Sequence, residues 1–262
     1  QSANDAATAI AEYIGGSVEG FVLMMNEEAE KLGMTNTVFQ TPHGLPPSAG
    51  QADDLTTSRD MATLGRALLS EFPELTALTG KIDGDFRNGT FKLHNHNNLL
   101  RHYDGCDGIK TGFHNGAGFC ITASAVRNNI RMITSVMGCN SIKSRTEEAS
   151  RLLSQGFAQY RLVKLIDDGA PVNQMVPVIK GKKKEVMPVA AKRVTGVVRI
   201  SNADKVEQIK ELCSELKAPV VKDTPCGQIR FLVNGHEVGR VDAVVREDIP
   251  KATLTERFWN LF

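Results

Sequence analysis

The chain contains 262 residues, a length that suits one large domain or two ordinary ones. Its 41% hydrophobic and 23% charged residues are typical of a globular protein. The net charge of +1 gives no electrostatic argument for binding nucleic acid, and no apolar stretch reaches the roughly 20 residues that span a bilayer.

Three helices are predicted in the N-terminal quarter of the chain, each between a capping residue and a glycine or proline. They cover residues 6–14, 17–33 and 61–69. The expected N-caps are Asn4 or Asp5, Ser17, and Thr57, which forms a capping-box pattern with Asp60. The Pro- and Gly-rich residues 35–50 are predicted to be a loop, and residues 80–105 are polar and turn-rich.

The middle of the chain alternates strand-like runs with turn signals. Three strands are predicted at residues 108–111, 119–126 and 130–137, and Asn128-Asn129 is expected to join the last two as a tight hairpin. Ser144 and Glu147 have the spacing of a capping box, which predicts a long helix from there to about Tyr160.

From about residue 161 the pattern changes to short Val- and Ile-rich runs between Gly, Pro and Lys clusters, which predicts a small β-rich domain over residues 161–249. Strands are expected at residues 163–166, 176–179, 197–200, 228–233 and 237–245. Asn234-Gly235 is a strong hairpin signal, and residues 206–216 are the one possible helix. Residues 250–262 place Leu254, Phe258, Leu261 and Phe262 on one face of a predicted amphipathic helix.

The five cysteines are odd in number and irregularly spaced, so neither a disulfide framework nor a zinc site is predicted. They are Cys106, Cys120, Cys139, Cys213 and Cys226. A disulfide between Cys213 and Cys226 is left open. Five histidines, at positions 43, 94, 96, 102 and 114, suggest a cluster, but His94-x-His96 lacks a clear carboxylate partner, so no metal and no cofactor is expected.

Two short motifs carry the chemistry. Lys110-Thr111-Gly112 and Ser2-Ala3-Asn4 match two of the three signatures of active-site serine enzymes that handle penicillins and D-Ala-D-Ala peptides. The third signature, Ser-x-x-Lys, carries the nucleophile and is expected upstream, where only Gln1 precedes Ser2. Ser214-Glu215-Leu216-Lys217 also fits that pattern, but it follows both other motifs and is rejected as a chance match.

The chain resembles the D-alanyl-D-alanine carboxypeptidases, which are low-molecular-mass penicillin-binding proteins. Besides the two motifs, the ordered matches are Met24-Met25-Asn26, Ala29 to Gly33, Asn36 to Phe39, His43-Gly44-Leu45, Gly116-Ala117-Gly118, Val136-Met137-Gly138, Arg145 and Glu147-Glu148-Ala149. The resemblance implies an α/β (α+β) transpeptidase-like core over residues 1–160, with helices on an antiparallel sheet. A β-rich domain and a membrane-surface helix at residues 250–262 then follow.

The resemblance also implies an activity and a location. The reaction is removal of the terminal D-alanine from peptidoglycan stem peptides through an acyl-enzyme, with β-lactams as acylating inhibitors, in the periplasm or at the extracytoplasmic face of the membrane. The sequence leaves open whether the Ser-x-x-Lys segment was cut away, is encoded separately or was never present, and a fragment or nicked chain is favoured. If such a segment exists as a separate chain, it is expected to be a partner of this one.

The same resemblance implies roles for individual residues. Ser2 passes protons near the leaving group, and Asn4 hydrogen-bonds the peptide group of the substrate. Lys110 supplies positive charge beside Ser2 and the substrate carboxylate. Thr111 and Arg145 bind that carboxylate, while the backbone N–H of Phe113, directly after Gly112, serves as one oxyanion donor.

Two other functions remain open at this point. A serine β-lactamase shares these motifs, but no Glu-x-x-x-Asn arrangement of a deacylation loop lies between Ser2 and Lys110, and the β-rich domain also disfavours it. The second alternative is a non-catalytic, peptidoglycan-binding remnant that retains the carboxylate pocket.

Overall fold

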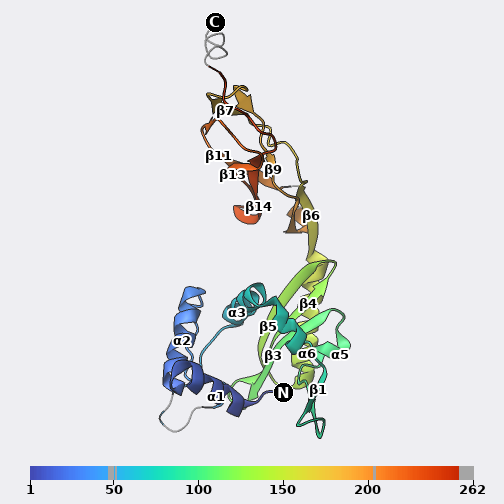
Figure 1. Ribbon diagram of the computed structural model, residues 1–262. Coiled ribbons are helices and arrows are strands. Elements are labelled where there is room, and N and C mark those ends of the chain that lie inside the picture. The colour runs from blue at the N-terminus through green and yellow to red at the C-terminus, as the bar shows by residue number, and fades with distance from the viewer. Residues whose placement is uncertain (47–49, 51, 203–204, 254–262) are drawn as a thin grey trace. The chain divides into compact units, whose positions relative to one another are not determined.

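The computed structural model describes residues 1–46, 50, 52–202 and 205–253, and the chain divides into two compact units, Gln1–Ala158 and Gln159–Phe262. The first unit combines helices with an antiparallel sheet, and the second consists mainly of strands. The mixed α/β class with a β-rich C-terminal part is therefore confirmed (Figure 1).

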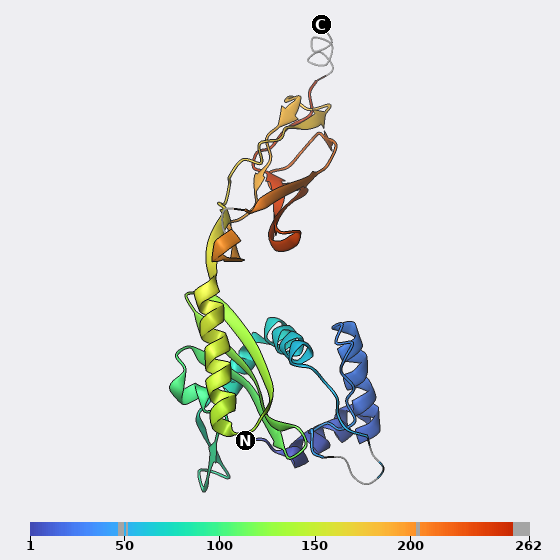
Figure 2. The ribbon, with the colours of Figure 1, turned by 180° about the vertical axis from the view of Figure 1, so that it is seen from behind.

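The first unit is built on a three-stranded antiparallel sheet of order β3-β4-β5, in which β3 spans Cys106–His114, β4 Gly118–Arg127 and β5 Ile130–Cys139. Helix α3 (Ser58–Glu71) covers one face and helix α6 (Ile142–Gln159) the other (Figures 1 and 2). On the α6 face, Ile121, Ala123 and Val136 pack against Ala149 and Leu153. This burial of apolar area holds the strands in place.

The N-terminal helices form close to the predicted positions. Helix α1 spans Asn4–Gly15 and α2 spans Val18–Lys31, with the Ser17 hydroxyl accepting a hydrogen bond from the Gly20 N–H as an N-cap. The α1 cap is different from the prediction, because Ala3 occupies the N-cap and no side chain caps it. Asp5 instead accepts a hydrogen bond from the Ala6 N–H within the first turn.

Helix α3 begins as predicted, with the Thr57 hydroxyl accepting from the Asp60 N–H. The reciprocal half of the capping box does not form. Asp60 is only 4% exposed, and its carboxylate accepts hydrogen bonds from the Thr37 hydroxyl and the Asn36 N–H. The carboxylate thus joins the helix to the preceding loop, a tertiary contact that local spacing does not encode.

The polar, turn-rich segment over residues 80–105 contains regular structure. A short 3₁₀ turn (Pro73–Leu75) and helix α4 (Thr76–Thr79) lead into the hairpin β1 (Asp83–Phe86) and β2 (Phe91–His94), and α5 covers Leu99–His102. The hairpin is not evident in the sequence because its strands are only four residues long and β1 shows no alternation, although β2 alternates apolar and polar residues.

The predicted hairpin at Asn128-Asn129 is confirmed, with both residues at positive φ (51° and 61°), as a two-residue type I′ turn requires. Helix α6 starts earlier than expected, because Ser141 rather than Ser144 accepts the capping hydrogen bond, from the Ser144 N–H. Tyr160 belongs to the following strand and not to the helix.

The second unit contains a four-stranded sheet of order β11-β13-β14-β9 and the antiparallel pair β10-β6. It also contains a three-stranded sheet, in which β7 pairs with β12 in parallel and with β8 in antiparallel orientation. These strands cover Tyr160–Ile166 (β6), Val176–Ile179 (β7), Glu185–Val186 (β8), Val189–Ala190 (β9), Val194–Arg199 (β10), Glu207–Leu212 (β11), Leu216–Lys217 (β12), Thr224–Val233 (β13) and His236–Val245 (β14). Their core is centred on Ile229 and Phe231. The Asn234-Gly235 turn is confirmed, again with positive φ at both residues.

The helix predicted at residues 206–216 is wrong, because β11 and β12 occupy this stretch. Val206, Ile209 and Leu212 have helical spacing, yet β11 pairs along its whole length with β13. The backbone hydrogen bonds and the core packing of a strand in this sheet outweigh the weak helical periodicity.

The predicted helix over residues 250–262 lies mostly outside the described residues. Residues 250–253 are not helical: Lys251 pairs with Gly181 in a β-bridge, and the Ala252 N–H donates to the Lys180 carbonyl. Within the described parts of the chain, helices that combine the length and apolarity of a membrane span are absent.

Candidate active site

The Lys-Thr-Gly triplet lies on β3, at the edge of the three-stranded sheet. Lys110 is paired with Thr122 of β4, Thr111 with Ile121 and Gly112 with Cys120. An edge strand leaves alternate backbone N–H and C=O groups unpaired on its outer side. β3 therefore carries the Lys110 side chain at the edge of the sheet.

A pocket of about 470 Å³ opens beside this strand, and we call it the Lys110 pocket. Its polar rim includes Ser2, Asn4, His43, Lys110 and Gly112. Its floor is apolar and comes from α3 and the sheet, through Met61, Leu64, Leu68, Ile121 and Met137. The structure thus brings the two motifs together although 108 positions separate Ser2 from Lys110 in the sequence.

Ser2 and Asn4 reach the pocket because α1 starts there. Ser2 is exposed and precedes the helix, while Asn4 is its first residue and is half-buried. Since Ala3 takes the N-cap position, the Asn4 side chain is not used to cap the helix. Its amide, which has both a donor and an acceptor, lines the Lys110 pocket.

The Lys110 amine donates a hydrogen bond to the carbonyl of Thr111. Lys110 is exposed at the sheet edge, but desolvation of its amine lowers its pKa from the ordinary value of 10.5, and the positive charge of Arg145 lowers it further. Among its described contacts the Lys110 ammonium has no carboxylate partner. The positive charges of Lys110 and Arg145 therefore favour the binding of an anion at this site.

Arg145 lies at the start of α6 and is only 4% exposed. Its guanidinium donates to the carbonyls of Cys120 and His96 over long distances of 3.4 Å each, and its Nε atom has no hydrogen-bond partner among the described residues. Burial lowers its pKa. Arg145 does not line the Lys110 pocket, whereas Thr111, 8% exposed, does.

Phe113 and Phe119 connect this arginine to the edge strand. Their rings stack with centroids 4.1 Å apart, and the guanidinium of Arg145 lies 6.0 Å from the centre of the Phe119 ring. Phe113 itself is 55% exposed at the rim. The stack fixes the end of β3 that follows Gly112.

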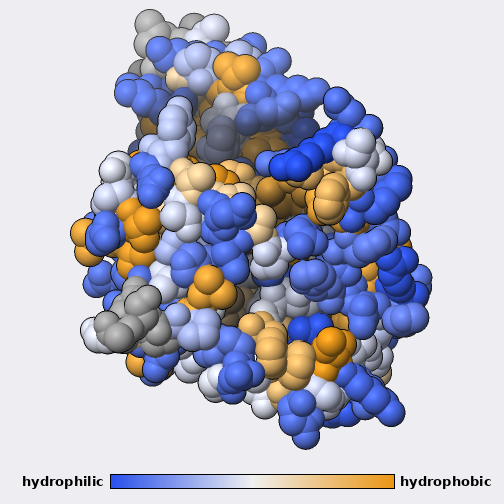
Figure 3. Space-filling model, turned by 90° about the horizontal axis from the view of Figure 1, so that it is seen from below, coloured by the Kyte–Doolittle hydropathy of each residue, from blue (hydrophilic) through white to orange (hydrophobic). Residues whose placement is uncertain are grey.

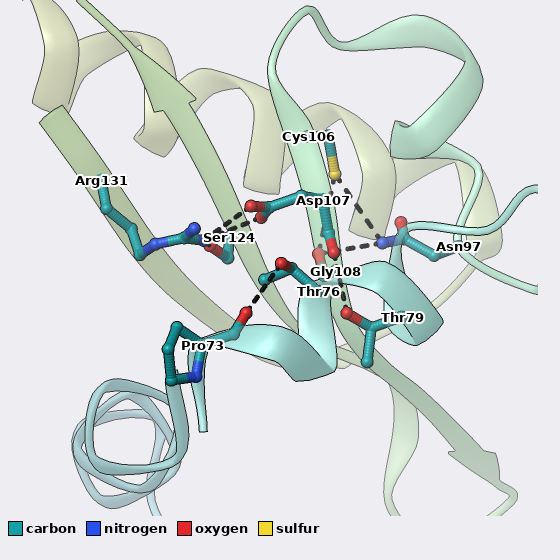
Figure 4. A network of polar contacts seen from close by, with 9 residues as sticks. All are labelled: Pro73, Thr76, Thr79, Asn97, Cys106, Asp107, Gly108, Ser124 and Arg131. Atoms are coloured by element: carbon teal, nitrogen blue, oxygen red, sulfur yellow. Dashed lines mark hydrogen bonds and ion pairs between the residues drawn. The ribbon is translucent and has the colours of Figure 1, made fainter. Parts of the chain in front are cut away.

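A polar network fixes the other end of β3 (Figure 4). The side-chain amide of Asn97, 3% exposed, donates to the Gly108 carbonyl at 3.1 Å, and the Thr79 hydroxyl donates to the Asp107 carbonyl at 2.8 Å. The Asp107 carboxylate accepts two hydrogen bonds from Arg131 of β5 at 2.8 and 2.9 Å. These contacts hold the strand two residues before Lys110.

The structure places two residues at the site to which the sequence alone assigns no role. His43 lies in a segment predicted as loop, but it lines the Lys110 pocket, and its Nδ1 atom accepts from the Leu45 N–H at 3.1 Å. Asn97 lies in the polar, turn-rich stretch and supports the start of β3 through its bond to the Gly108 carbonyl. The only signal for His43 is its place in the family-like stretch His43-Gly44-Leu45. Ser214, the rejected nucleophile, belongs to the second unit.

Comparisons with known proteins agree with this geometry. Residues 1–141 match the family described as D-alanyl-D-alanine carboxypeptidase, and residues 160–251 match the C-terminal domain of penicillin-binding protein 5. D-alanyl-D-alanine carboxypeptidase DacC of Escherichia coli is 36% identical over 99% of this chain, and DacF of Bacillus subtilis is 32% identical over 96%. In each case the chain spans 64% of the relative's length.

Solved structures show the same relationship. Penicillin-binding protein 5 from Haemophilus influenzae superposes with a TM-score of 0.68 at 32% identity, covering 95% of this chain and 72% of that one. Penicillin-binding protein 3 from Streptococcus pneumoniae, at 24% identity and a TM-score of 0.81 over 95% of this chain and 74% of that one, shares the fold. Because the family match covers more than half of the residues, this chain belongs to the D-alanyl-D-alanine carboxypeptidase family.

Proposed function

We propose that this chain forms the greater part of a serine-type D-Ala-D-Ala carboxypeptidase, which removes the terminal D-alanine from peptidoglycan stem peptides through an acyl-enzyme. The observation that carries the proposal is the shared pocket of Ser2, Asn4 and Lys110 on an edge strand. Acyl transfer needs a nucleophile, a base, a proton path to the leaving amine and an oxyanion hole.

The residues divide these tasks. The Lys110 ammonium supplies charge beside the leaving group and the terminal carboxylate, and Ser2 relays the proton to the departing D-alanine. Asn4 holds the peptide group of the substrate, and the Phe113 N–H on the edge strand donates to the developing oxyanion. Thr111 provides a hydroxyl for the carboxylate, while Arg145 adds its buried positive charge from behind β4.

The nucleophile belongs to a Ser-x-x-Lys segment that precedes Ser-x-Asn in the family's order. The pocket floor and the helices offer an apolar surface on which such a segment can pack: Leu23 of α2 is 65% exposed and Tyr13 of α1 is 91% exposed. Figure 3 shows several separate groups of hydrophobic side chains on the face seen from below. Buried together with a partner helix, such groups stabilise the fold.

Labelling with a fluorescent penicillin tests this assignment. Residues 1–262 alone should form no covalent adduct, and supplying the Ser-x-x-Lys segment, fused or as a second chain, should restore labelling at its serine. In the restored protein, Lys110→Ala should reduce the acylation rate on the order of 10²–10³-fold, as the loss of an oxyanion donor does. Labelling of residues 1–262 at Ser2 or Ser214, or a Lys110→Ala variant within threefold of the parent, would contradict the proposal.

A chromogenic β-lactam separates the proposed activity from that of a serine β-lactamase and from a non-catalytic remnant. The carboxypeptidase should accumulate a stable adduct with little turnover and should release D-alanine from a stem-peptide analogue. Continuous hydrolysis of the β-lactam would identify a β-lactamase. The absence of both labelling and D-alanine release, with the segment bound, would leave a binding protein.

We further propose that the protein acts at the extracytoplasmic face of the membrane, with residues 254–262 as a surface anchor. This stretch combines Leu254, Phe258, Trp259, Leu261 and Phe262 with Arg257. The apolar side chains, which can enter a membrane interface, are the basis of this proposal, because Glu256 and Arg257 leave the stretch without a net side-chain charge. Deleting residues 254–262 should abolish binding to anionic vesicles while leaving Ala252, which is buried, in place. Unchanged vesicle binding would eliminate the anchor.

A further inference from the structure

Two cysteines of the second unit lie opposite each other on neighbouring strands. Cys213 directly follows edge strand β11, and Cys226 lies within β13. In the ladder, Glu211 faces Gln228 and Leu212 faces Gly227, so Cys213 and Cys226 are the next pair in register. The Cys213 N–H donates to the Cys226 carbonyl at 2.7 Å, which continues the ladder by one step.

The two side chains also share one face of the sheet. Cys226 is 3% exposed and belongs to the core of the second unit, and Cys213, half-buried, packs against that same core. Burial and then the neighbouring Cys213 thiol raise the pKa of Cys226 to about 11, so the two thiols lie close enough to interact.

Residues directly opposite in an antiparallel ladder have Cα atoms about 4.5–5.5 Å apart, which falls inside the range of about 4.4–6.8 Å found in disulfides. We propose that Cys213 and Cys226 form a disulfide that joins β11 to β13. The proposal rests on the extracytoplasmic location inferred above, because disulfides persist in oxidising compartments.

The step requires a disulfide-bearing oxidant, such as the disulfide of a thiol oxidase or of oxidised glutathione. The Cys213 thiolate attacks one sulfur of that disulfide, and the other sulfur leaves as a thiolate. The Cys226 thiolate then attacks the Cys213 sulfur and releases the second thiolate. Two cysteine thiols are thus oxidised, losing two electrons and two protons, and one oxidant disulfide is reduced to two thiols. Cys213 is the first attacker because it is the more exposed and Cys226 is held protonated.

The bond would close a loop that includes β12, whose Leu216 and Lys217 pair with β7. Strand β11 has β13 as its neighbour on one side and lies at the edge of its sheet. A covalent link at the end of β11 therefore holds an edge strand and its following loop in register. The other three cysteines lie in the first unit, where the Cys106 and Cys120 thiols donate to backbone carbonyls.

Peptide mapping of residues 1–262, oxidised with oxidised glutathione and alkylated without reduction, tests the bond directly. Trypsin should release residues 211–217 and 223–230 as one linked species, two hydrogen atoms lighter than the sum of the peptides, and three thiols per chain should remain alkylated. Reduction should separate the peptides and lower the midpoint of thermal unfolding of the second unit by on the order of 10 °C.

The substitution Cys213→Ser, at a half-buried position, should abolish both the linked species and the effect of reduction, and Cys226→Ala should do the same. Cys106→Ser serves as the control and should retain both. Complete alkylation of Cys213 and Cys226 in the oxidised protein, or a linked species that contains another cysteine, would overturn the proposal. Neither readout depends on catalysis, so this result is separate from the outcome of the penicillin labelling.

Discussion

Lys110 shows how the surroundings of one side chain set the chemistry of the site. The triplet identifies the residue from sequence, but its lowered pKa arises from desolvation of the amine and from the charge of Arg145, which lies 35 positions later on helix α6. The sequence can indicate that the lysine is present. Its electrostatic environment depends on the packing of α6 beneath the sheet.

The lowered pKa of Lys110 predicts the pH dependence of acylation. Because burial disfavours its charged form, the ammonium is lost at a pH below 10.5, and the acylation rate should fall there as pH rises. Lys110→Arg keeps the charge at higher pH, so this basic limb should move upward even if the maximal rate is lower. The position of this limb is measured from the rate of penicillin acylation at increasing pH, in the protein that contains the Ser-x-x-Lys segment. Lys143→Arg, at an exposed lysine, is the control. If the fall of the acylation rate occurs at the same pH in Lys110→Arg, the titrating group is not Lys110.

Asn97 is the buried residue that holds the beginning of β3. Its amide donates to the Gly108 carbonyl and its oxygen accepts from the Leu99 N–H, both at 3.1 Å. Asn97→Ala leaves both backbone groups without these partners, so we expect the free energy of unfolding to fall by about 2 kcal/mol. Chemical denaturation measures the change. Asn36→Ala, at an exposed side chain whose bond among the described residues is to its neighbour Thr35, should change the free energy of unfolding by less than about 0.5 kcal/mol. If both substitutions lower the free energy of unfolding equally, the buried hydrogen bonds of Asn97 do not stabilise β3 as proposed.

At the scale of elements, the sequence predicts what local interactions decide. The turns at Asn128-Asn129 and Asn234-Gly235 form as expected, because both need residues that tolerate positive φ. The Ser17 and Thr57 caps also form. β11 is not predicted because pairing with a distant strand determines its conformation, and Asp60 leaves its capping box for a loop 23 residues away. The Lys110 pocket is equally non-local, so only the family-like motifs indicate its members.

The contact between α3 and the sheet depends on a small residue. A Cβ atom at Gly65 would lie 3.1 Å from Ile109 Cδ1 and from Thr122 Cγ2, the ends of two side chains. Gly65→Ala gains helix propensity and needs only small shifts, so its net effect should be within about 1 kcal/mol. Gly65→Val should destabilise by about 1–3 kcal/mol through overpacking. Gly84→Val, at a strand position with open space, is the control for denaturation. A Gly65→Val variant as stable as the parent would show that α3 can move away without cost.

At the scale of the whole molecule, each unit contains its own hydrophobic cluster. Leu153 of α6 is 1% exposed in the first unit, and Phe231 of β13 is fully buried in the second. Each cluster draws all its members from one unit, so loss of a core side chain should act first on the unit that contains it. This separation is what allows the penicillin labelling and the cysteine mapping to report on different parts of one chain.

Two matched core truncations test that separation. Phe231→Ala should cost about 3–5 kcal/mol and Leu153→Ala about 2–5 kcal/mol, because each removes buried contacts and leaves a cavity. Amide hydrogen exchange measured by peptide should then rise in β11, β13 and β14 for Phe231→Ala, and in β3, β4 and β5 for Leu153→Ala, with the other unit unchanged. Raising exchange equally in both units with either substitution would mean that the two clusters unfold as a single cooperative core. In that case the oxidation state of Cys213 and Cys226 would also alter the hydrogen-exchange protection of β3, the strand that carries Lys110.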